Sequence, residues 1–272
     1  MLPAPTRCRQ TAVLEIMALS DHKIVVVMPA YNAAMTLQNT LGEMPRDIVD
    51  HIILVDDASS DETVRIAEQM GLEVISHEHN RGYGGNQKTC YQAALKHNPD
   101  IVAMVHPDYQ YTPLILRAMC CLIAEANYQF VLGSRILLNG ALHGGMPKYK
   151  YVANRFLTLF QNLCLGNKFS EYHTGYRVYH ADILREIDFE QFSDDFVFDN
   201  QMITEIVLRG YALGEVSCPT RYFDEASSIN FQRSVKYGLG VLSTSMQGLV
   251  SRITGKHSIL GNSATLPEQT PE

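Results

Sequence analysis

A histidine, an aspartate and a glutamine lie at alternate positions in the stretch VHPDYQYTP, which covers residues 105–113. The apolar run before them, residues 100–105, predicts a strand. Because alternate residues of a strand point to the same side, His106, Asp108 and Gln110 can approach a single point. Carboxylate, amide and imidazole groups are all ligands of divalent metals. The spacing therefore makes these three residues candidates for a metal site.

The elements that must position these residues are strands alternating with helices. Continuous apolar runs predict strands at residues 23–30, 51–59, 72–78, 100–105 and 129–135. The intervening segments predict helices at residues 32–44, 62–71, 88–97 and 112–126. Farther along, a helix that Gly210 closes is followed by one more strand. This order is typical of a single α/β domain with a mostly parallel sheet flanked by helices.

Glycines and polar residues mark several of the predicted helix ends. We expect Asn32 to be the N-cap of the first helix and Gly71 to close the second. Pro113 lies in the first turn of the fourth helix, where proline is favoured. Residues 80–87, NRGYGGNQ, predict a glycine-rich loop that leads into the third helix.

Polar clusters follow the predicted strands at their carboxyl ends. The clusters are PAYN, DDASSD, HPDYQ and GSR, which begin at residues 29, 56, 106 and 133. In parallel α/β sheets, ligands bind at this edge. We therefore expect the four clusters to contribute to one site.

The bulk composition excludes several classes of protein. A net charge of −7 over 272 residues argues against nucleic-acid binding through a basic surface. The six cysteines form no CxxC pair and are interpreted as reduced thiols of a cytoplasmic protein. No apolar run approaches the ~20 residues of a membrane-spanning helix. We expect residues 1–21 to be a flexible extension and residues 257–272 a disordered tail.

Two later segments carry apolar stripes at helical spacing. The first stripe, in residues 149–166, comprises Val152, Phe156, Leu159, Phe160 and Leu163. The second, in an amphipathic C-terminal helix at residues 231–256, comprises Val235, Leu239, Leu242, Met246, Leu249 and Ile253. Three interpretations of the second stripe stay open: packing on the rest of the domain, a homodimer seam, or contact with a membrane surface.

Five motifs occur in order between residues 25 and 135: VVVMPAYNAAMTL, ILVDDASSDET, NRGYGGNQK, HPD and GSR. As an ordered set they resemble family 2 glycosyltransferases of the GT-A fold. The later motifs HTGYRVY and FDNQM are similar to the acceptor-side half of the dolichyl- or polyprenyl-phosphate sugar synthase branch. The resemblance implies a Rossmann-like GT-A domain over residues 22–230.

The resemblance also implies an inverting transfer from a UDP- or GDP-sugar with Mn²⁺ or Mg²⁺ as cofactor. The metal would stabilise the charge that develops on the departing nucleoside diphosphate. Asp108 would be the main ligand, assisted by His106 and Gln110. The family usually has aspartate where this chain has His106. Because imidazole suits magnesium poorly, we expect Mn²⁺ to support activity at least as well as Mg²⁺.

The donor side of the site follows from the same resemblance. The loop under the base and ribose would consist of Pro29, Ala30, Tyr31 and Asn32. Asp57 would accept a hydrogen bond from the base, although DDASSD can also serve only as a turn and helix cap. Gly82 and its neighbouring glycines would let the backbone approach the ligand. Lys88 would lie near the diphosphate, with a purely structural turn as the alternative.

The acceptor side is expected to contain two arginines and a carboxylate. Arg135 and Arg177 would contact phosphate as planar forks, unless they form ion pairs only. Asp199 would be the general base for a hydroxyl acceptor or, alternatively, a helix N-cap. Glu225 and Ile229 stand where the lipid-phosphate branch carries an arginine and a lysine, which is a departure from that branch.

The resemblance therefore implies sugar transfer to a lipid-linked or other glycan acceptor, such as a polyprenyl phosphate or glycolipid. We expect a cytoplasmic protein that acts at the inner face of the membrane. Two alternatives are a sugar-1-phosphate nucleotidyltransferase and a non-catalytic nucleotide-sugar-binding protein. The first requires a glycine-rich basic loop directly after the first strand, where this chain has PAYNAAM. The second, a non-catalytic binding protein, stays open because His106 stands where the family usually has aspartate.

Overall fold

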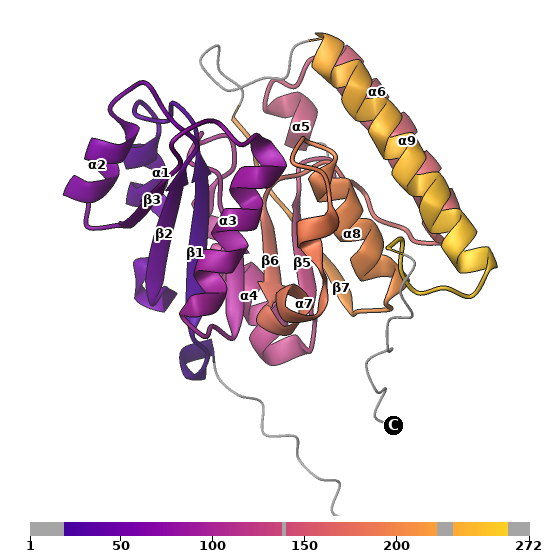
Figure 1. The fold of residues 1–272 in the computed structure, drawn as a ribbon, viewed down its shortest axis with the longest axis horizontal. Coiled ribbons are helices and arrows are strands. Elements are labelled where there is room, and N and C mark those ends of the chain that lie inside the picture. Colours follow the sequence, from indigo (N-terminus) through magenta and orange to yellow (C-terminus); the bar gives the residue numbers. More distant parts are fainter. Residues whose placement is uncertain (1–18, 138–139, 222–230, 261–272) are drawn as a thin grey trace, which may run out of the picture.

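A seven-stranded sheet lies at the centre of the computed structural model, which describes residues 19–137, 140–221 and 231–260 (Figure 1). The strand order is β3-β2-β1-β4-β6-β5-β7. β6 runs antiparallel to its neighbours β4 and β5, and the other pairs are parallel. The strands are β1 (Ile24–Ala30), β2 (His51–Asp56), β3 (Glu73–Ser76), β4 (Ile101–Met104), β5 (Phe130–Ser134), β6 (Arg177–His180) and β7 (Leu213–Ser217).

Helices cover both faces of this sheet and bury two hydrophobic cores. The helices are α1 (Leu37–Glu43), α2 (Thr63–Gln69), α3 (Tyr83–Lys96), α4 (Leu116–Ala126), α5 (Gly140–His143), α6 (Lys148–Leu165), α7 (Ala181–Glu186), α8 (Phe198–Leu208) and α9 (Phe231–Ile253). Residues of α1, α2 and α4 contribute to one core, and residues of α3, α7 and α8 to the other. In β1, Ile24 and Val26 belong to the first core and Val25 and Val27 to the second. Burial on both faces explains the continuous apolar run of this strand.

The α/β fold expected from the sequence is confirmed, and the predicted strands are present as β1 to β5 and β7. β6 has no counterpart among the predicted strands because its four residues, RVYH, form no continuous apolar run. It is inserted between β4 and β5 by pairing over a long sequence distance. A mixed pairing of this kind depends on tertiary contacts rather than on local pattern.

The helix ends agree with expectation in part. Gly71 has a φ of +74°, and Pro113 opens the 3₁₀ turn before α4. Asn32 is not an N-cap: α1 begins farther along, and Asn32 has a φ of +52°. Its side-chain Oδ1 instead accepts a hydrogen bond from the N–H of Ser60 at 2.9 Å. α3 begins at Tyr83, so most of the predicted glycine-rich loop is helical.

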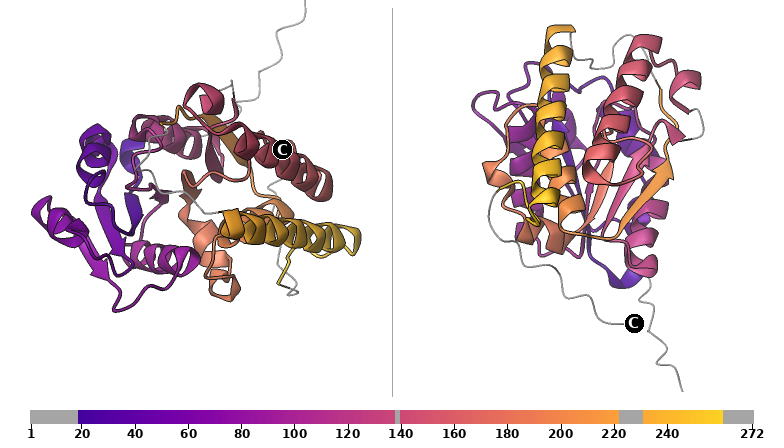
Figure 2. Two further views of the ribbon diagram at one scale, coloured as in Figure 1. Left: turned by 90° about the horizontal axis from the view of Figure 1, so that it is seen from above. Right: turned by 90° about the vertical axis from the view of Figure 1, so that its right-hand side faces the viewer.

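α6 and α9 form an additional layer along one side of the molecule, where they lie side by side (Figures 1 and 2). Their last turns meet, since the Arg252 Nη1 donates to the carbonyl of Cys164 at 2.8 Å. α9 packs on α6 and α8 through a face that includes Val241, Ser245 and Gly248. Of the three interpretations of the predicted stripe, packing on the domain is the one that the structure does not support, because α9 packs mainly through its opposite face. Val235, Leu239, Met246 and Ile253 of the stripe are exposed, and Leu242 and Leu249 are half-buried.

Several expectations fall outside the described residues. The structure does not describe most of the expected N-terminal extension or of the expected C-terminal tail. Glu225 and Ile229 also lie outside the described residues. Leu19–Asp21, at the end of the expected extension, form a short 3₁₀ helix. None of the described helices combines the length and apolar character that crossing a bilayer requires.

Candidate functional site

The carboxyl ends of β1, β2 and β4 lie next to one another and form what we call the carboxyl edge. β1 is the central strand of the three, with Ala30 paired to Asp56 of β2 and Val27 paired to Met104 of β4. The residues that follow β2 and β4, including Asp57 and Asp108, therefore lie at the same edge of the sheet. This arrangement is what a shared site requires.

Three residues beyond this edge have a backbone conformation that is uncommon outside glycine. Asn32, Ala58 and Tyr109 have φ values of +52°, +62° and +56°, and they follow β1, β2 and β4 respectively. Left-handed non-glycine residues are few in most proteins and cluster at ligand sites, because the surrounding structure must hold them in place. The carboxyl edge is therefore a sharply turned and firmly held part of the fold.

The loops after β1 and β2 are tied together by hydrogen bonds. The Asn32 N–H donates to Ser59 Oγ at 2.8 Å, and the Ala33 N–H donates to Thr63 Oγ1 at 2.8 Å. Pro29 and Ala30 are buried in β1 beneath this loop, and the Tyr31 side chain is exposed. Of the predicted base-and-ribose loop, Tyr31 and Asn32 are thus the residues on the surface.

Asp57 holds the glycine-rich segment. Its buried carboxylate accepts hydrogen bonds from the Arg81 N–H at 2.8 Å and the Gly82 N–H at 3.1 Å, and it contacts His77 Nδ1 at 2.8 Å. His77 Nε2 in turn contacts Thr89 of α3 at 3.0 Å. Asp57 is therefore a clamp between β2 and the start of α3, whatever it also does for a ligand.

Asn86, in the first turn of α3, lies beneath the ends of β1 and β2 and was not singled out by the sequence analysis. Its Nδ2 donates to the carbonyls of Val55 at 3.1 Å and Ala30 at 3.4 Å, joining the ends of β1 and β2. The Oδ1 atoms of Asn86 and Asp56 are buried and have no hydrogen-bond partner in the part of the chain that the structure describes. Buried acceptors of this kind are rare. The available signal was the place of Asn86 within the glycine-rich segment NRGYGGNQ.

His106 and Asp108 lie together beyond β4. The imidazole of His106 stacks on Tyr83, with ring centroids 5.6 Å apart, and its Nε2 is 3.3 Å from the Tyr83 hydroxyl. A Cβ atom on Gly175 would lie 2.4 Å from that Nε2, so only glycine leaves room for the ring. Burial lowers the pKa of His106, against the opposing effect of Asp108, and the imidazole is therefore neutral at pH 7.

Asp108 has a charge that the protein compensates only partly. Burial raises the pKa of its carboxyl, and His106, the Gln110 N–H and Arg135 offset part of this effect. The Gln110 N–H donates to Asp108 Oδ1 at 3.1 Å, and the Gln110 carbonyl accepts from Arg221. A cation placed beside this carboxylate would relieve the remaining cost of burial.

These donors are compatible with a metal that takes other ligands from its substrate. Among the described residues, no group of three or more His, Cys, Asp and Glu side chains is arranged to hold a metal ion. A neutral imidazole and a partly desolvated carboxylate nevertheless both have lone pairs to offer. His106 and Asp108 thus fit a divalent cation only as a partial ligand set.

Asp199 lies at the centre of a buried hydrogen-bond network. Its carboxylate accepts hydrogen bonds from the Tyr83 hydroxyl at 2.8 Å and from Gln87 Nε2 at 2.9 Å. Arg177 Nη1 forms an ion pair with Asp199 Oδ1 at 2.8 Å. The N-cap position of α8 is Val197, without a side-chain hydrogen bond, so the N-cap alternative for Asp199 is wrong.

Arg177 is a core residue rather than a surface fork for phosphate. It is fully buried in β6, and its Nε donates to the carbonyl of Thr174 at 2.9 Å. Burial by itself would lower the pKa of the guanidinium, but Asp199 and nearby tyrosines hold it above its usual value. The structure does not support the expected contact of Arg177 with a phosphate. The guanidinium is buried and forms an ion pair with Asp199, as in the ion-pair alternative.

Arg135 lies at the end of β5 and is bound to a buried carboxylate. Its N–H and Nε donate to Glu171 at 2.8 and 2.9 Å, and its Nη2 donates to the His173 carbonyl at 2.7 Å. Burial would raise the pKa of Glu171, but Arg135 holds it below the usual value. Asn154 of α6 also donates to Glu171, at 2.7 Å. Arg135 and Glu171 therefore join the end of β5 to α6.

Lys88 has no donor left for a diphosphate. Its Nζ donates to the carbonyls of Glu190 at 3.0 Å and Phe192 at 2.6 Å and to Asp194 Oδ1 at 2.8 Å. An ammonium group has three donors, and all three are used. The structure favours the structural alternative for Lys88 over the expected contact with the diphosphate. The residue joins α3 to the segment before α8.

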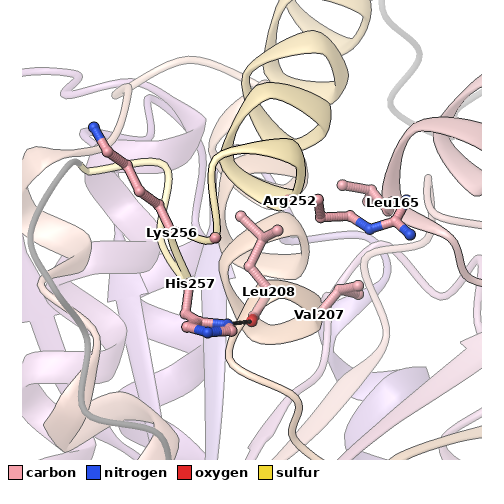
Figure 3. A pocket seen from close by; sticks show the side chains of 7 residues that line it. Leu165, Val207, Leu208, Arg252, Lys256 and His257 are labelled. Carbon is pink, nitrogen blue, oxygen red and sulfur yellow. Dashed lines mark hydrogen bonds between the residues drawn. The ribbon is translucent and has the colours of Figure 1, made fainter.

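A cavity of about 300 Å³ lies away from the carboxyl edge, at the last turns of α6, α8 and α9 (Figure 3). It is lined by Leu165, Val207, Leu208, Arg252, Gly255, Lys256 and His257. Leu208 ends α8, the helix whose first turn holds Asp199, and its carbonyl contacts His257 Nδ1 at 3.3 Å. None of the residues that the sequence singled out for chemistry lines this cavity.

Residues 25–188 match the sequence profile described as glycosyl transferase family 2. The chain belongs to this family. The matched part runs from β1 through α7 and includes every strand end of the carboxyl edge. The expected family and enzyme class are thereby confirmed.

Curated relatives of this glycosyltransferase include two that act on lipid phosphates by name. The undecaprenyl-phosphate mannosyltransferase of Micrococcus luteus is 26% identical over 247 residues, covering 88% of this chain and 99% of that protein. The UDP-N-acetylglucosamine–dolichyl-phosphate N-acetylglucosaminyltransferase of Methanococcus voltae is 27% identical over 184 residues, covering 61% of this chain and 73% of that protein.

A solved structure confirms the GT-A-like fold of the glycosyltransferase. Glucosyl-3-phosphoglycerate synthase from Mycobacterium tuberculosis, solved with Mn²⁺, UDP and phosphoglyceric acid, superimposes with a TM-score of 0.64. The two chains are 17% identical, and the match covers 86% of this chain and 81% of the other. At this identity the likeness establishes the fold alone.

Proposed function

We propose that this family 2 glycosyltransferase transfers a hexose, with inversion, from a UDP- or GDP-sugar to a polyprenyl-type lipid phosphate. The proposed acceptor class rests on one observation, which is that the carboxylate of Asp199 is fully engaged by neighbouring side chains. A hydroxyl acceptor needs a base to take its proton, whereas a phosphate is already anionic. Because Arg177, Gln87 and Tyr83 all bind the carboxylate of Asp199, the predicted base is not free to act.

The relatives support the same class of acceptor. One is named as an undecaprenyl-phosphate transferase and another as a dolichyl-phosphate transferase, and the first is covered almost entirely by the match. A lipid-phosphate acceptor also favours a reaction at the inner face of the membrane. Among the alternatives, the nucleotidyltransferase has no support from the family match, and the non-catalytic binding protein is an outcome of the test below.

On the donor side, the carboxyl edge would bind the nucleotide. Pro29 and Ala30 form the floor, and Tyr31 and Asn32 lie on the surface above it. Asp57 would present its carboxylate edge to the base while clamping the Arg81–Gly82 backbone. The tied loops after β1 and β2 restrict the shape of this surface before the donor arrives, which reduces the entropy lost on binding.

His106 and Asp108 would hold a divalent metal, Mn²⁺ or Mg²⁺, with Gln110 contributing through the segment it shares with Asp108. When bound, the metal supplies a Lewis acid that neutralises the departing diphosphate. Tyr83 orients the imidazole of His106 by stacking and by the contact of its hydroxyl with Nε2. The acceptor phosphate then displaces the nucleoside diphosphate directly, which inverts the anomeric carbon.

The test uses two acceptors that share one isoprenoid chain, a polyprenyl phosphate and the corresponding polyprenol. Purified protein is incubated with Mn²⁺ and a panel of UDP- and GDP-hexoses, and products are separated by mass. We expect transfer to the phosphate only, with an inverted anomeric centre by NMR. Comparable transfer to the polyprenol would overturn the proposed acceptor. Donor binding without any turnover would identify a binding protein instead.

A further inference from the structure

α6 exposes its apolar side and buries a mostly polar side, which is the reverse of a usual surface helix. The side chains that it buries are mostly polar: Asn154 donates to Glu171, Thr158 donates to Asn154 at 3.3 Å, and Gln161 donates to Asn200 at 2.8 Å. The opposite face is apolar and 59–71% exposed, and comprises Tyr149, Val152, Phe156, Leu159 and Leu163. An ordinary amphipathic helix buries its apolar stripe.

α9 has the same inverted arrangement. Its buried side includes Thr244, Ser245, Gly248 and Ser251, which are small or polar. Its outward side carries five large apolar side chains, 46–76% exposed: Val235, Leu239, Met246, Val250 and Ile253. We call the two outward stripes of α6 and α9 together the apolar face. Large exposed apolar side chains gathered on two neighbouring helices mark an interaction site.

The two helices also differ in charge from the rest of the molecule. α6 and α9 contain no acidic residue, whereas the whole chain has 29 acidic and 22 basic residues. Their basic residues are Lys148, Lys150, Arg155, Arg233, Lys236 and Arg252. Lys236 pairs with Asp195 of the neighbouring loop, and Arg155 and Arg252 donate to backbone carbonyls, which leaves their charge in place.

From these observations we propose that the apolar face lies on an anionic lipid bilayer. A wide apolar stripe with basic residues and no acidic ones fits the boundary between acyl chains and negatively charged headgroups. A second copy of the chain is a poorer partner, because a two-fold interface would place the same basic surface against itself. The proposal deepens the proposed function, on which it rests for the lipid nature of the acceptor.

α9 is connected to the end of β5 and to the first turn of α8, where Arg135 and Asp199 lie. Near the start of α9, the Tyr237 hydroxyl contacts His173 Nδ1 at 2.8 Å and accepts from Asn200 Nδ2 at 2.6 Å. His173 accepts through its carbonyl from Arg135, the residue that ends the GSR motif. Figure 2 shows both helices on one side of the molecule, facing the viewer in its right-hand view. A bilayer on that side would meet the first turns of α9 next to the site.

The experiment is flotation of the full chain with vesicles of phosphatidylcholine alone or mixed with phosphatidylglycerol. We expect flotation with the mixed vesicles and little with phosphatidylcholine alone, weakening as salt is raised. The double variant Phe156→Glu/Leu239→Glu should reduce the bound fraction about tenfold, since two large apolar side chains can no longer be buried. The matched control is Leu114→Glu, at a leucine 62% exposed outside the apolar face, which should float like the parent chain.

Two readouts separate this proposal from its rivals and from the proposed function. Sedimentation in the absence of lipid gives the oligomeric state, and a dimer that the double variant dissociates would overturn the proposal in favour of a second copy. Transfer to a short, water-soluble isoprenyl phosphate tests the function without a bilayer. If the parent chain uses this acceptor but does not float, the bilayer contact is wrong. If it floats but uses no lipid phosphate, the proposed function is wrong.

Discussion

Arg177 Nη1 lies 2.8 Å from Asp199 Oδ1, and both side chains are buried next to the predicted site. The pair joins β6, the antiparallel strand of the sheet, to the first turn of α8. Tyr83 and Gln87 bring α3 into the same network. The carboxylate is therefore a junction of three elements before it is a candidate for chemistry.

Replacing Asp199 with Asn should destabilise the protein strongly. The change leaves the guanidinium of Arg177 buried without its counter-charge, which typically costs about 3–5 kcal/mol. Urea unfolding followed by circular dichroism measures the loss. An unaltered midpoint combined with lost transfer would instead show that Asp199 is the general base.

Replacing Asp108 with Asn should have opposite effects on stability and on metal response. Because burial raises the pKa of this carboxyl, its ionised form disfavours the native state at neutral pH, and the neutral amide should stabilise the metal-free protein. The same change should remove the rise in melting temperature on adding Mn²⁺ with nucleoside diphosphate. A variant that keeps this Mn²⁺-dependent rise would exclude Asp108 as a ligand.

His106→Asp restores the residue that the family usually has at this position. A second carboxylate favours hard cations, so the ratio of Mg²⁺-supported to Mn²⁺-supported transfer should increase. Initial rates with each metal at saturation give the ratio for the variant and the parent chain. An unchanged ratio would mean that His106 does not touch the metal.

Gly84→Ala should destabilise the protein by about 1–3 kcal/mol through overpacking. A Cβ atom there would lie 2.4 Å from the Ser193 carbonyl oxygen and 2.8 Å from Phe198 Cβ. Gly42, in α1, is the matched control, because nothing lies within 4 Å of its added Cβ and alanine is the better helix former. Thermal melts of the two variants should shift in opposite directions.

His173 should make the protein sensitive to mild acid. Burial lowers its pKa to about 4, below the value near 6.5 of an unfolded histidine. The unfolded chain therefore binds the proton first, and stability is complete above about pH 6.5 and falls as the pH drops towards 4, by up to about 3 kcal/mol. His106 shifts in the same direction, so the contribution of His173 is the difference between the parent chain and His173→Gln. Parallel stability curves for the two proteins between pH 7 and 4 would contradict this prediction.

The sequence by itself determined every described strand except β6, and also the place where polar groups gather. Runs such as IVVVMPA are apolar throughout because both faces of β1 are buried, and this local signal needs no knowledge of neighbours. The positions of Asp57 and Asp108 at one edge follow from the parallel order of the strands. The motifs that resemble the family lie at these strand ends, which is why family and fold could be predicted together.

The tertiary structure decided what each charged side chain does. The motifs around Lys88 and Arg177 predicted that both residues bind phosphate. In the structure their partners are Asp194 and Asp199, which come from distant parts of the chain. A buried charge takes the counter-charge that packing brings to it, and spacing along the sequence does not encode that choice. The stripes of α6 and α9 show the same limit. Periodicity reveals that a helix has an apolar side, but only the packed structure shows that this side faces outward.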